Sequence, residues 1–145
     1  MYTNETGHLL KDTLDVARPN QKYPGPDFGM YSTAWDVFRF CQVMLQHGSR
    51  HGHQVLSPSL ISAMVQPLVP TSFPAYYTGL GWAVHPAGAA QPNYPVTNGA
   101  YGHDGAAGGR MWVDPSRQLV RIFLTHRFGG DFTEADTFMK TAFAA

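Results

Sequence analysis

The chain has a single cysteine and no excess of charge of either sign. Cys41 has no second cysteine to pair with, so no internal disulfide holds this fold together. Ten Lys and Arg balance ten Asp and Glu, which leaves no basic field for nucleic acid. The first twenty residues carry repeated charges and no long apolar run. We therefore expect neither a signal peptide nor a membrane span in this chain, and the compartment stays unknown.

Motifs for several kinds of chemistry are also absent. The three histidines within residues 47–53 have no carboxylate or thiolate beside them, so we expect no metal site. The glycines of residues 102–109 fit neither dinucleotide nor P-loop spacing, and a strand pattern follows them, so we expect no cofactor. No serine lies in a G-x-S-x-G elbow, and none is followed three residues later by lysine.

What the chain does contain is enough apolar surface for one folded domain. Hydrophobic residues make up 43% of it and aromatic residues 13%, which is typical of a packed globule. Residues 1–29 are polar and interrupted by proline and glycine, which predicts an extended or looping lead-in. Residues 30–145 are then expected to form a single α+β domain.

Two helices are predicted in the first half of this domain. Over residues 33–48 apolar positions recur at helical spacing, a T-x-x-D capping box opens the segment, and Gly48 ends it. Residues 57–67 predict a second, shorter helix, with Ser57 as N-cap and a proline at the first helical position. Cys41 lies on the apolar face of the first helix, so we expect a buried structural thiol rather than a nucleophile.

Downstream the apolar period changes from helical spacing to two. Strands are predicted at residues 78–85, 110–113 and 118–127, and the link of residues 114–117 fits a type I turn with Pro115 in its second position. The middle of the last strand is apolar on both faces, so it requires cover on both sides.

A closing helix follows a second capping box, formed by Thr133 and Asp136, and its apolar residues can cover one sheet face. The predicted fold is therefore an antiparallel sheet of three to four strands with helices packed on it. The pattern does not show what covers the second face.

Four segments in this order resemble the C-terminal part of the serine β-lactamase-like superfamily, which includes class C β-lactamases, penicillin-binding peptidases and related esterases. The segments are GMYSTAWDVFRFCQVMLQHG, QVLSPSLISAMVQP, GLGWAV and YGHDGAAGGRMWVDPSRQLVRIFLTHR. The resemblance covers essentially the whole chain but less than half of the family's catalytic domain. It implies an incomplete β-lactamase/transpeptidase-like fold. Family members are often exported.

In that family three motifs meet at one acyl-transfer site: S-x-x-K carries the nucleophile, Y-x-N assists proton transfer, and K-T-G or H-x-G lies on a strand beside them. His103, Asp104 and Gly105 match the third motif. The resemblance implies that His103 faces the substrate and offers a proton or partial positive charge, and that Gly105 leaves room for the acyl group. The backbone N–H of Ala106 would be one donor of the oxyanion hole.

Two departures from the family pattern concern this motif. Histidine in place of lysine is only partly charged near neutral pH, which favours an ester over a penicillin-type substrate. Asp104 occupies a position where a hydroxyl residue or glycine is commoner. The resemblance implies that it binds substrate together with His103. On the strand it either stabilises the protonated form of His103 or faces away from it.

The first two motifs are the larger departure. S-x-x-K is absent, and Y-x-N is represented only by Tyr2-Thr3-Asn4, much closer to the first helix than the family places it. We therefore expect the C-terminal portion of a serine hydrolase acting on esters or amides, inactive alone. It would require self-association or a complementary N-terminal half, and would take a small acyl substrate only once the site is complete.

Two other interpretations remain open. The chain could be a stand-alone, non-catalytic binding module derived from that fold, with a self-sufficient core and no need of a partner. It could instead be an unrelated hydrolase that assembles Ser32, His103 and an aspartate in space, which sequence alone cannot test.

Overall fold

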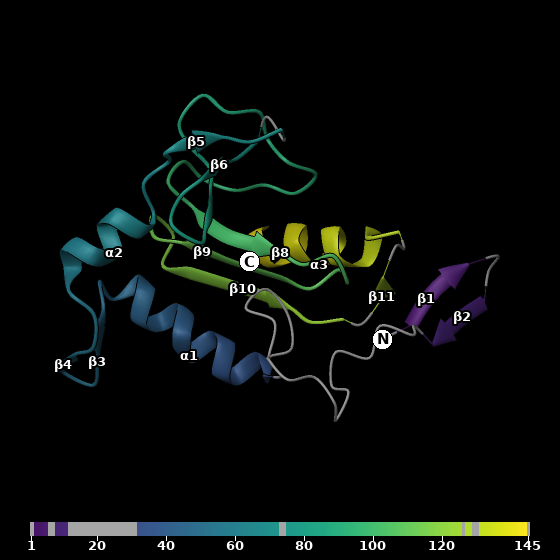
Figure 1. Cartoon of the computed structure of the whole chain (residues 1–145), viewed down its shortest axis with the longest axis horizontal. Helices are drawn as coiled ribbons and strands as arrows, with labels where there is room; N and C mark the ends of the chain where they lie inside the picture. Colours follow the sequence, from purple (N-terminus) through teal and green to yellow (C-terminus); the bar gives the residue numbers. More distant parts are fainter. Residues whose placement is uncertain are drawn as a thin grey trace, which may run out of the picture.

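The computed structural model describes residues 2–5, 8–11, 32–72, 75–125, 127–128 and 131–144. Within these ranges the chain alternates short strands with three helices (Figure 1). The elements in chain order are β1 (Tyr2–Glu5), β2 (His8–Lys11), α1 (Ala34–Leu45), β3 (Ser49–Arg50), β4 (His53–Gln54), α2 (Pro58–Met64), β5 (Val69–Pro70), β6 (Tyr77–Thr78), β7 (Ala83–Val84), β8 (Tyr101–Asp104), β9 (Arg110–Asp114), β10 (Leu119–Phe123), β11 (Arg127–Phe128) and α3 (Thr133–Ala144).

The main sheet confirms the predicted α+β class but is wider than the pattern indicates. It has six antiparallel strands in the order β10-β9-β8-β7-β6-β5, rather than three to four. β5 is two residues long, too short to show a period of two. The single strand predicted over residues 78–85 is instead two short strands, β6 and β7, separated by a turn. The apolar pattern does not indicate β8, whose YGHD sequence contains glycine and no alternating apolar run, so the strand is expected only from the resemblance of its H-x-G motif.

The predicted lead-in, residues 1–29, contains two of the described strands. β1 pairs with β2 in an antiparallel hairpin and with β11 in parallel, with Tyr2 opposite Arg127. The Y-x-N triplet Tyr2-Thr3-Asn4 thus lies within β1. Except for β1 and β2, the lead-in lies outside the described residues.

Helices cover both faces of the main sheet, and α1 supplies the second cover that the sequence pattern left open. Figure 1 shows α1 and α3 on opposite sides of β9 and β10. On the α1 side, Cys41 and Met44 pack with Trp82, Tyr101 and Val113. On the α3 side a second cluster is made of Tyr94, Val96, Ala100, Trp112 and Met139. β10, which is apolar on both faces, lies between α1 and α3.

The N-terminal ends of α1 and α2 confirm the sequence prediction. The Thr33 hydroxyl accepts a hydrogen bond from the Asp36 N–H at 3.1 Å, and the Ser57 hydroxyl accepts one from the Leu60 N–H at 3.2 Å. At the C-terminal end of α1, His47 with a φ of 52° takes the left-handed position after the C-cap Gln46, and the predicted stop Gly48 follows it with a φ of 87°.

The turn between β9 and β10 also has the predicted form. The Arg117 N–H donates to the Asp114 carbonyl at 3.3 Å, which places Pro115 in the second position of the turn. The Asp114 carboxylate stabilises the same turn, since its Oδ1 atom accepts from the Ser116 hydroxyl at 2.8 Å and from the Arg117 N–H at 3.2 Å.

The start of α3 differs from the prediction. Thr133 is the first helical residue, and the Asp131 side chain accepts from its N–H at 2.9 Å. The predicted capping box between Thr133 and Asp136 is wrong, because the Asp136 carboxylate instead forms an ion pair with Arg110 on β9. A charge-assisted contact with a nearly buried guanidinium outweighs a local cap.

Candidate functional site

Strand β8, which carries the H-x-G motif, changes from an interior strand to an edge strand along its length. Tyr101 and Gly102 pair with β7 on one side and β9 on the other. Among the residues that the structure describes, His103 and Asp104 pair only with β9, because β7 begins at Ala83. Within that part of the chain, the second half of β8 therefore borders an open sheet edge.

A tight turn before β7 produces this open edge. The Gly79 N–H donates to the Trp82 carbonyl at 2.8 Å, and Gly81 adopts a φ of 80°. The chain is thereby turned away before it could pair with His103 or Asp104.

The backbone groups of Asp104 face the open edge. Along an antiparallel strand, successive residues direct their N–H and C=O groups to opposite sides. The Ala100 carbonyl accepts from the His85 N–H next to β7, whereas the Gly105 N–H donates to the Gly109 carbonyl on the β9 side. Even-numbered residues of β8 therefore direct their backbone toward β7, on the side where no described strand lies opposite Asp104.

The side chain of His103 lies on the α1 face of the sheet and is exposed. It stands opposite Met111, which packs against the α1-side core, and directly opposed side chains share a face. Gly105 and Ala106 follow in a turn in which the Gly108 N–H donates to the Gly105 carbonyl at 2.9 Å. A Cβ atom added at Gly105 would have Gly109 O as its nearest neighbour, at 3.5 Å. The motif therefore leaves open space at this glycine.

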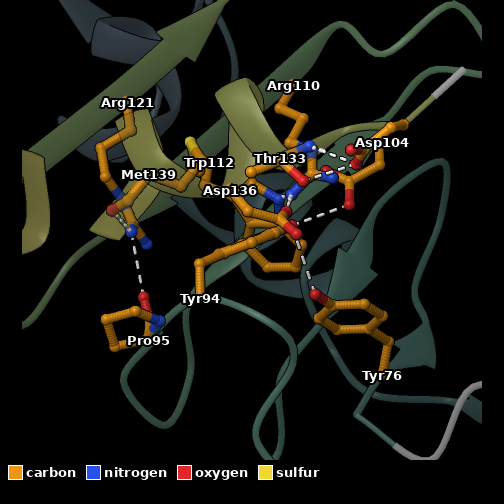
Figure 2. A network of polar contacts seen from close by, with 11 residues as sticks. Tyr76, Tyr94, Pro95, Asp104, Arg110, Trp112, Arg121, Thr133, Asp136 and Met139 are labelled. Atoms are coloured by element: carbon orange, nitrogen blue, oxygen red, sulfur yellow. Dashed lines mark hydrogen bonds and ion pairs between the residues drawn. The ribbon is translucent and has the colours of Figure 1, made fainter. Parts of the chain in front are cut away.

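The carboxylate of Asp104 lies on the opposite, α3 face and accepts two hydrogen bonds (Figure 2). The indole N–H of Trp112 donates to Oδ1 at 2.9 Å, and the hydroxyl of Tyr94 donates to Oδ2 at 2.7 Å. The Tyr76 hydroxyl in turn donates to that of Tyr94 at 3.3 Å. The structure therefore separates Asp104 from His103, on opposite faces of one strand.

The two tyrosines of this network remain protonated over the physiological pH range. Burial raises the pKa of Tyr76 to about 12. Burial also raises the pKa of Tyr94 well above its usual range, and the negative charge of Asp104 raises it further. The Tyr94 hydroxyl therefore stays a hydrogen-bond donor toward the carboxylate.

Arg110 connects this network to α3. Its guanidinium forms the ion pair with Asp136 and stacks over the Tyr94 ring, 4.7 Å from the ring centroid. The side chain is 8% exposed, so the contact is shielded from solvent. These two contacts of Arg110 hold α3 and the Tyr94 ring against the sheet.

Sequence reasoning did not connect Tyr94 and Trp112 with the motif. Tyr94 lies in a Pro- and Gly-rich loop ten residues before Asp104, and loop sequences carry no period from which a contact could be read. For Trp112 a signal exists, because Gly102 lies directly opposite it. A glycine facing a tryptophan across two strands indicates that the ring lies over the glycine.

Other candidate residues have ordinary surroundings. Cys41 is fully buried, and burial raises the pKa of its thiol to about 11, which fits a structural role. The Ser32 hydroxyl is exposed and donates to the carbonyl of Thr33, at 3.4 Å. Among the described residues, no three His, Cys, Asp or Glu side chains gather as a metal site, and no helix is long and apolar enough to cross a membrane.

Comparison with known proteins identifies the fold first and the family second. The chain superimposes on a mutant of simvastatin synthase (LovD) from Aspergillus terreus with a TM-score of 0.78 and 16% identity, over 99% of this chain and 42% of that one. EstCE1, a hydrolase with promiscuous acyltransferase activity, superimposes with a TM-score of 0.73 and 23% identity, over 100% of this chain and 39% of EstCE1. A penicillin-binding protein homologue from Caulobacter crescentus superimposes with a TM-score of 0.58 and 18% identity, over 73% of this chain and 30% of the homologue.

The family model named Beta-lactamase matches residues 3–145, so the chain belongs to the β-lactamase family. This confirms the resemblance on which the sequence analysis relied. No curated protein matches the chain. The chain spans about two fifths of the length of LovD and EstCE1.

Proposed function

We propose that this chain supplies the third-motif strand of a serine-hydrolase acyl-transfer site, with His103 as its polar side chain facing the substrate. The observation that carries the proposal is the open half-edge of β8. It brings an exposed imidazole, a glycine with free space and unpaired strand backbone together at one place. An acyl group lying along such an edge meets backbone donors suited to a developing oxyanion.

The charges around the motif favour a neutral ester of a small acyl group as substrate. Arg110 is engaged by Asp136, and the Asp104 carboxylate accepts hydrogen bonds on the far face, so His103 is the basic side chain that the motif presents to a ligand. An imidazole binds a carboxylate less strongly than the ammonium group of lysine does. The structural neighbour EstCE1 is a hydrolase with promiscuous acyltransferase activity, which supports acyl transfer at this site.

The nucleophile of this site must come from another segment that carries S-x-x-K, because this sequence has none. The α1 side of the molecule offers a surface for such a segment. Trp35 and Phe40 on α1 are 60% and 46% exposed. Phe40 stacks on Trp82, which in turn contacts Tyr101 of β8, so this apolar surface runs toward the His103 face of the strand.

Covalent labelling with a fluorophosphonate probe tests the proposal. The chain alone is expected to show no labelling and no burst with a p-nitrophenyl ester. Mixing it with an S-x-x-K-bearing N-terminal segment of a relative such as EstCE1 is expected to produce both. His103→Ala should reduce the burst rate at least tenfold, whereas His53→Ala, in the exposed β3–β4 hairpin, is a matched control that should not.

Two results would contradict the proposal. Stoichiometric labelling of the chain alone would show a nucleophile of its own and would support an unrelated hydrolase built on Ser32. A stable complex with the N-terminal segment that is never acylated would instead support the non-catalytic binding module. Translation of the source DNA upstream of the Met1 codon, in all frames, would show whether S-x-x-K and Y-x-N are encoded next to this chain.

A further inference from the structure

We propose that Asp104 is a positioning residue that holds the free half of β8 in place from the face opposite the substrate. This inference rests on the proposed function for its purpose, but its structural content can be tested without acyl transfer. It assigns Asp104 a different role from binding substrate beside His103.

The need for such a residue follows from the sheet. A strand paired on one side has one row of backbone hydrogen bonds instead of two, and its end is the part most prone to open. β8 loses its β7 neighbour after Gly102, at the point where the motif begins. A strand edge that binds a ligand must nevertheless be ordered before the ligand arrives, because a preorganised site loses little further conformational entropy on binding.

The Asp104 side chain provides the missing second attachment. Its two oxygens accept hydrogen bonds from Trp112 and Tyr94, at 2.9 and 2.7 Å, and hydrogen bonds to an ionised group are stronger than those between neutral groups. These contacts come from the α3 face, so they leave the backbone of Asp104 free at the open edge. The strand end is therefore attached on one face and accessible at its edge.

The two donors are themselves held firmly. A Cβ atom added at Gly102 would lie 2.6 Å from Trp112 Cδ2, which shows that the indole ring lies against the β8 backbone. Trp112 is 1% exposed and Tyr94 is 3% exposed. Arg110 covers the Tyr94 ring, and the Tyr76 hydroxyl donates to the Tyr94 hydroxyl.

The loop that carries Tyr94 is attached at its base by a buried histidine. The His85 Nδ1 atom lies 2.7 Å from the carbonyl of Ala75, and its Nε2 atom lies 3.1 Å from the side-chain nitrogen of Gln91. The carbonyl requires a proton on Nδ1, so Nε2 accepts from Gln91. The Gln91 Oε1 atom then accepts from the Val96 N–H at 3.2 Å, which closes the loop around Tyr94.

Amide hydrogen exchange by ¹⁵N NMR on this chain tests the proposal. In Asp104→Ala, exchange at His103 and at Gly105, whose N–H donates to the Gly109 carbonyl, should accelerate about tenfold or more beyond what the change in global stability explains. The indole N–H resonance of Trp112 should move upfield as its acceptor is lost. Asp104→Asn keeps the volume of the side chain and an oxygen for Trp112 but loses the charge, so it should restore only part of both effects, whereas a role in packing alone would be restored in full.

Two further variants, one in the network around Asp104 and one outside it, complete the test. Tyr94→Phe removes one donor with little change in volume, and should accelerate the same amides even if Asp104→Ala fails to fold. Thr97→Val removes a 2.6 Å hydrogen bond to Asp114, at the other end of β9, and should lower global stability without a local effect at β8.

The proposal is overturned if exchange at His103 and Gly105 in Asp104→Asn and Tyr94→Phe changes no more than in Thr97→Val. It is also overturned if the Trp112 indole resonance is unchanged in Asp104→Ala. Failure of the proposed function would appear separately, as a complemented protein that is never acylated while these exchange effects persist.

Discussion

The glycines around His103 serve different purposes, and their surroundings distinguish them. Gly102 is a close-approach position, where a Cβ atom would lie 2.2 Å from the Met111 carbonyl oxygen and 2.6 Å from the Trp112 ring. Gly105 has ordinary space around it, with its nearest contact at 3.5 Å. The first glycine is therefore needed for packing, whereas the second is free to serve a ligand.

Gly102→Ala is expected to destabilise the chain by about 1 to 3 kcal/mol, because the methyl group must displace Trp112 or the β9 backbone. Gly105→Ala is the matched control and should change the free energy of unfolding by about 0.5 kcal/mol or less. Urea unfolding followed by tryptophan fluorescence measures both. Equal effects of the two substitutions would show that the Trp112 contact does not require a glycine.

Cys41 is expected to be inert in the folded chain. It is fully buried, and burial raises the pKa of its thiol to about 11, so little thiolate exists at pH 8. Alkylation by iodoacetamide at pH 8, followed by mass spectrometry, should be at least tenfold slower in buffer than in 6 M urea, with free cysteine as the reference. Equal rates in the two solvents would contradict a buried thiol.

Among the elements, α3 is attached to the sheet through arginines. Arg121 on β10 is 1% exposed and donates through Nη1 to the Met139 carbonyl at 2.7 Å and to the Pro95 carbonyl at 3.0 Å. The pair of Arg110 and Asp136 provides a second attachment near the start of the helix. These contacts also bring the loop that carries Tyr94 close to α3.

Asp136→Ala should therefore cost about 3 kcal/mol or more of stability, because it leaves the nearly buried Arg110 guanidinium without its carboxylate. Arg39→Ala, which breaks an exposed pair with Asp36, is the control and should cost about 0.5 kcal/mol or less. Chemical denaturation gives both values. Similar costs for the two variants would mean that the Arg110 charge finds another partner or reaches solvent.

The features that could be predicted from the sequence are those determined by contacts between residues close together in the chain. The caps of α1 and α2 and the turn at Pro115 were predicted correctly because residues within four positions of one another decide them. β5 was missed, and β6 and β7 were predicted as one strand, because their pairing depends on distant partners. β8 was indicated by its H-x-G motif and not by any local period. The cap of α3 was wrong because Asp136 is drawn to Arg110, 26 residues away.

The same distinction between local and distant contacts applies to the H-x-G motif. The H-x-G match and the order of four segments sufficed to place the chain in its family. The orientation of Asp104 depends on Tyr94 and Trp112, which no local pattern connects with it. Strand alternation, applied together with the glycine opposite Trp112, could have suggested the second of these contacts.

The molecule as a whole buries several groups in their neutral forms, which predicts a loss of stability at high pH. Burial raises the pKa values of Cys41 to about 11 and Tyr76 to about 12, and raises that of Tyr101 above its usual range. In the unfolded chain these groups ionise first, so the unfolded state binds fewer protons above pH 9.

The free energy of unfolding should therefore fall as pH rises from 9 to 11, by up to about 1.4 kcal/mol per pH unit for each such group. Urea titrations at fixed pH values measure this slope, and Cys41→Ala should reduce it between pH 9 and 11. A flat profile over that window would contradict burial of these groups.

The apolar surface on α1 predicts that the isolated chain does not stay monomeric. Trp35 and Phe40 are exposed on one helix, and such surfaces favour association. Light scattering after gel filtration should show a dimer or larger species, and Phe40→Glu should shift it toward the monomer. A monodisperse monomer that binds no hydrophobic dye would favour the self-sufficient binding module.

The order of strands in the main sheet has a consequence for how the chain folds. From β5 to β10, each strand lies next to the strand before it in the sequence, so the spatial order repeats the chain order. Such a sheet forms by successive hairpins with no crossover that waits for a remote segment, and its loops are short except for residues 85–100 between β7 and β8. We expect the β8–β9–β10 meander to form early and to be in place before any nucleophile-bearing segment docks on it.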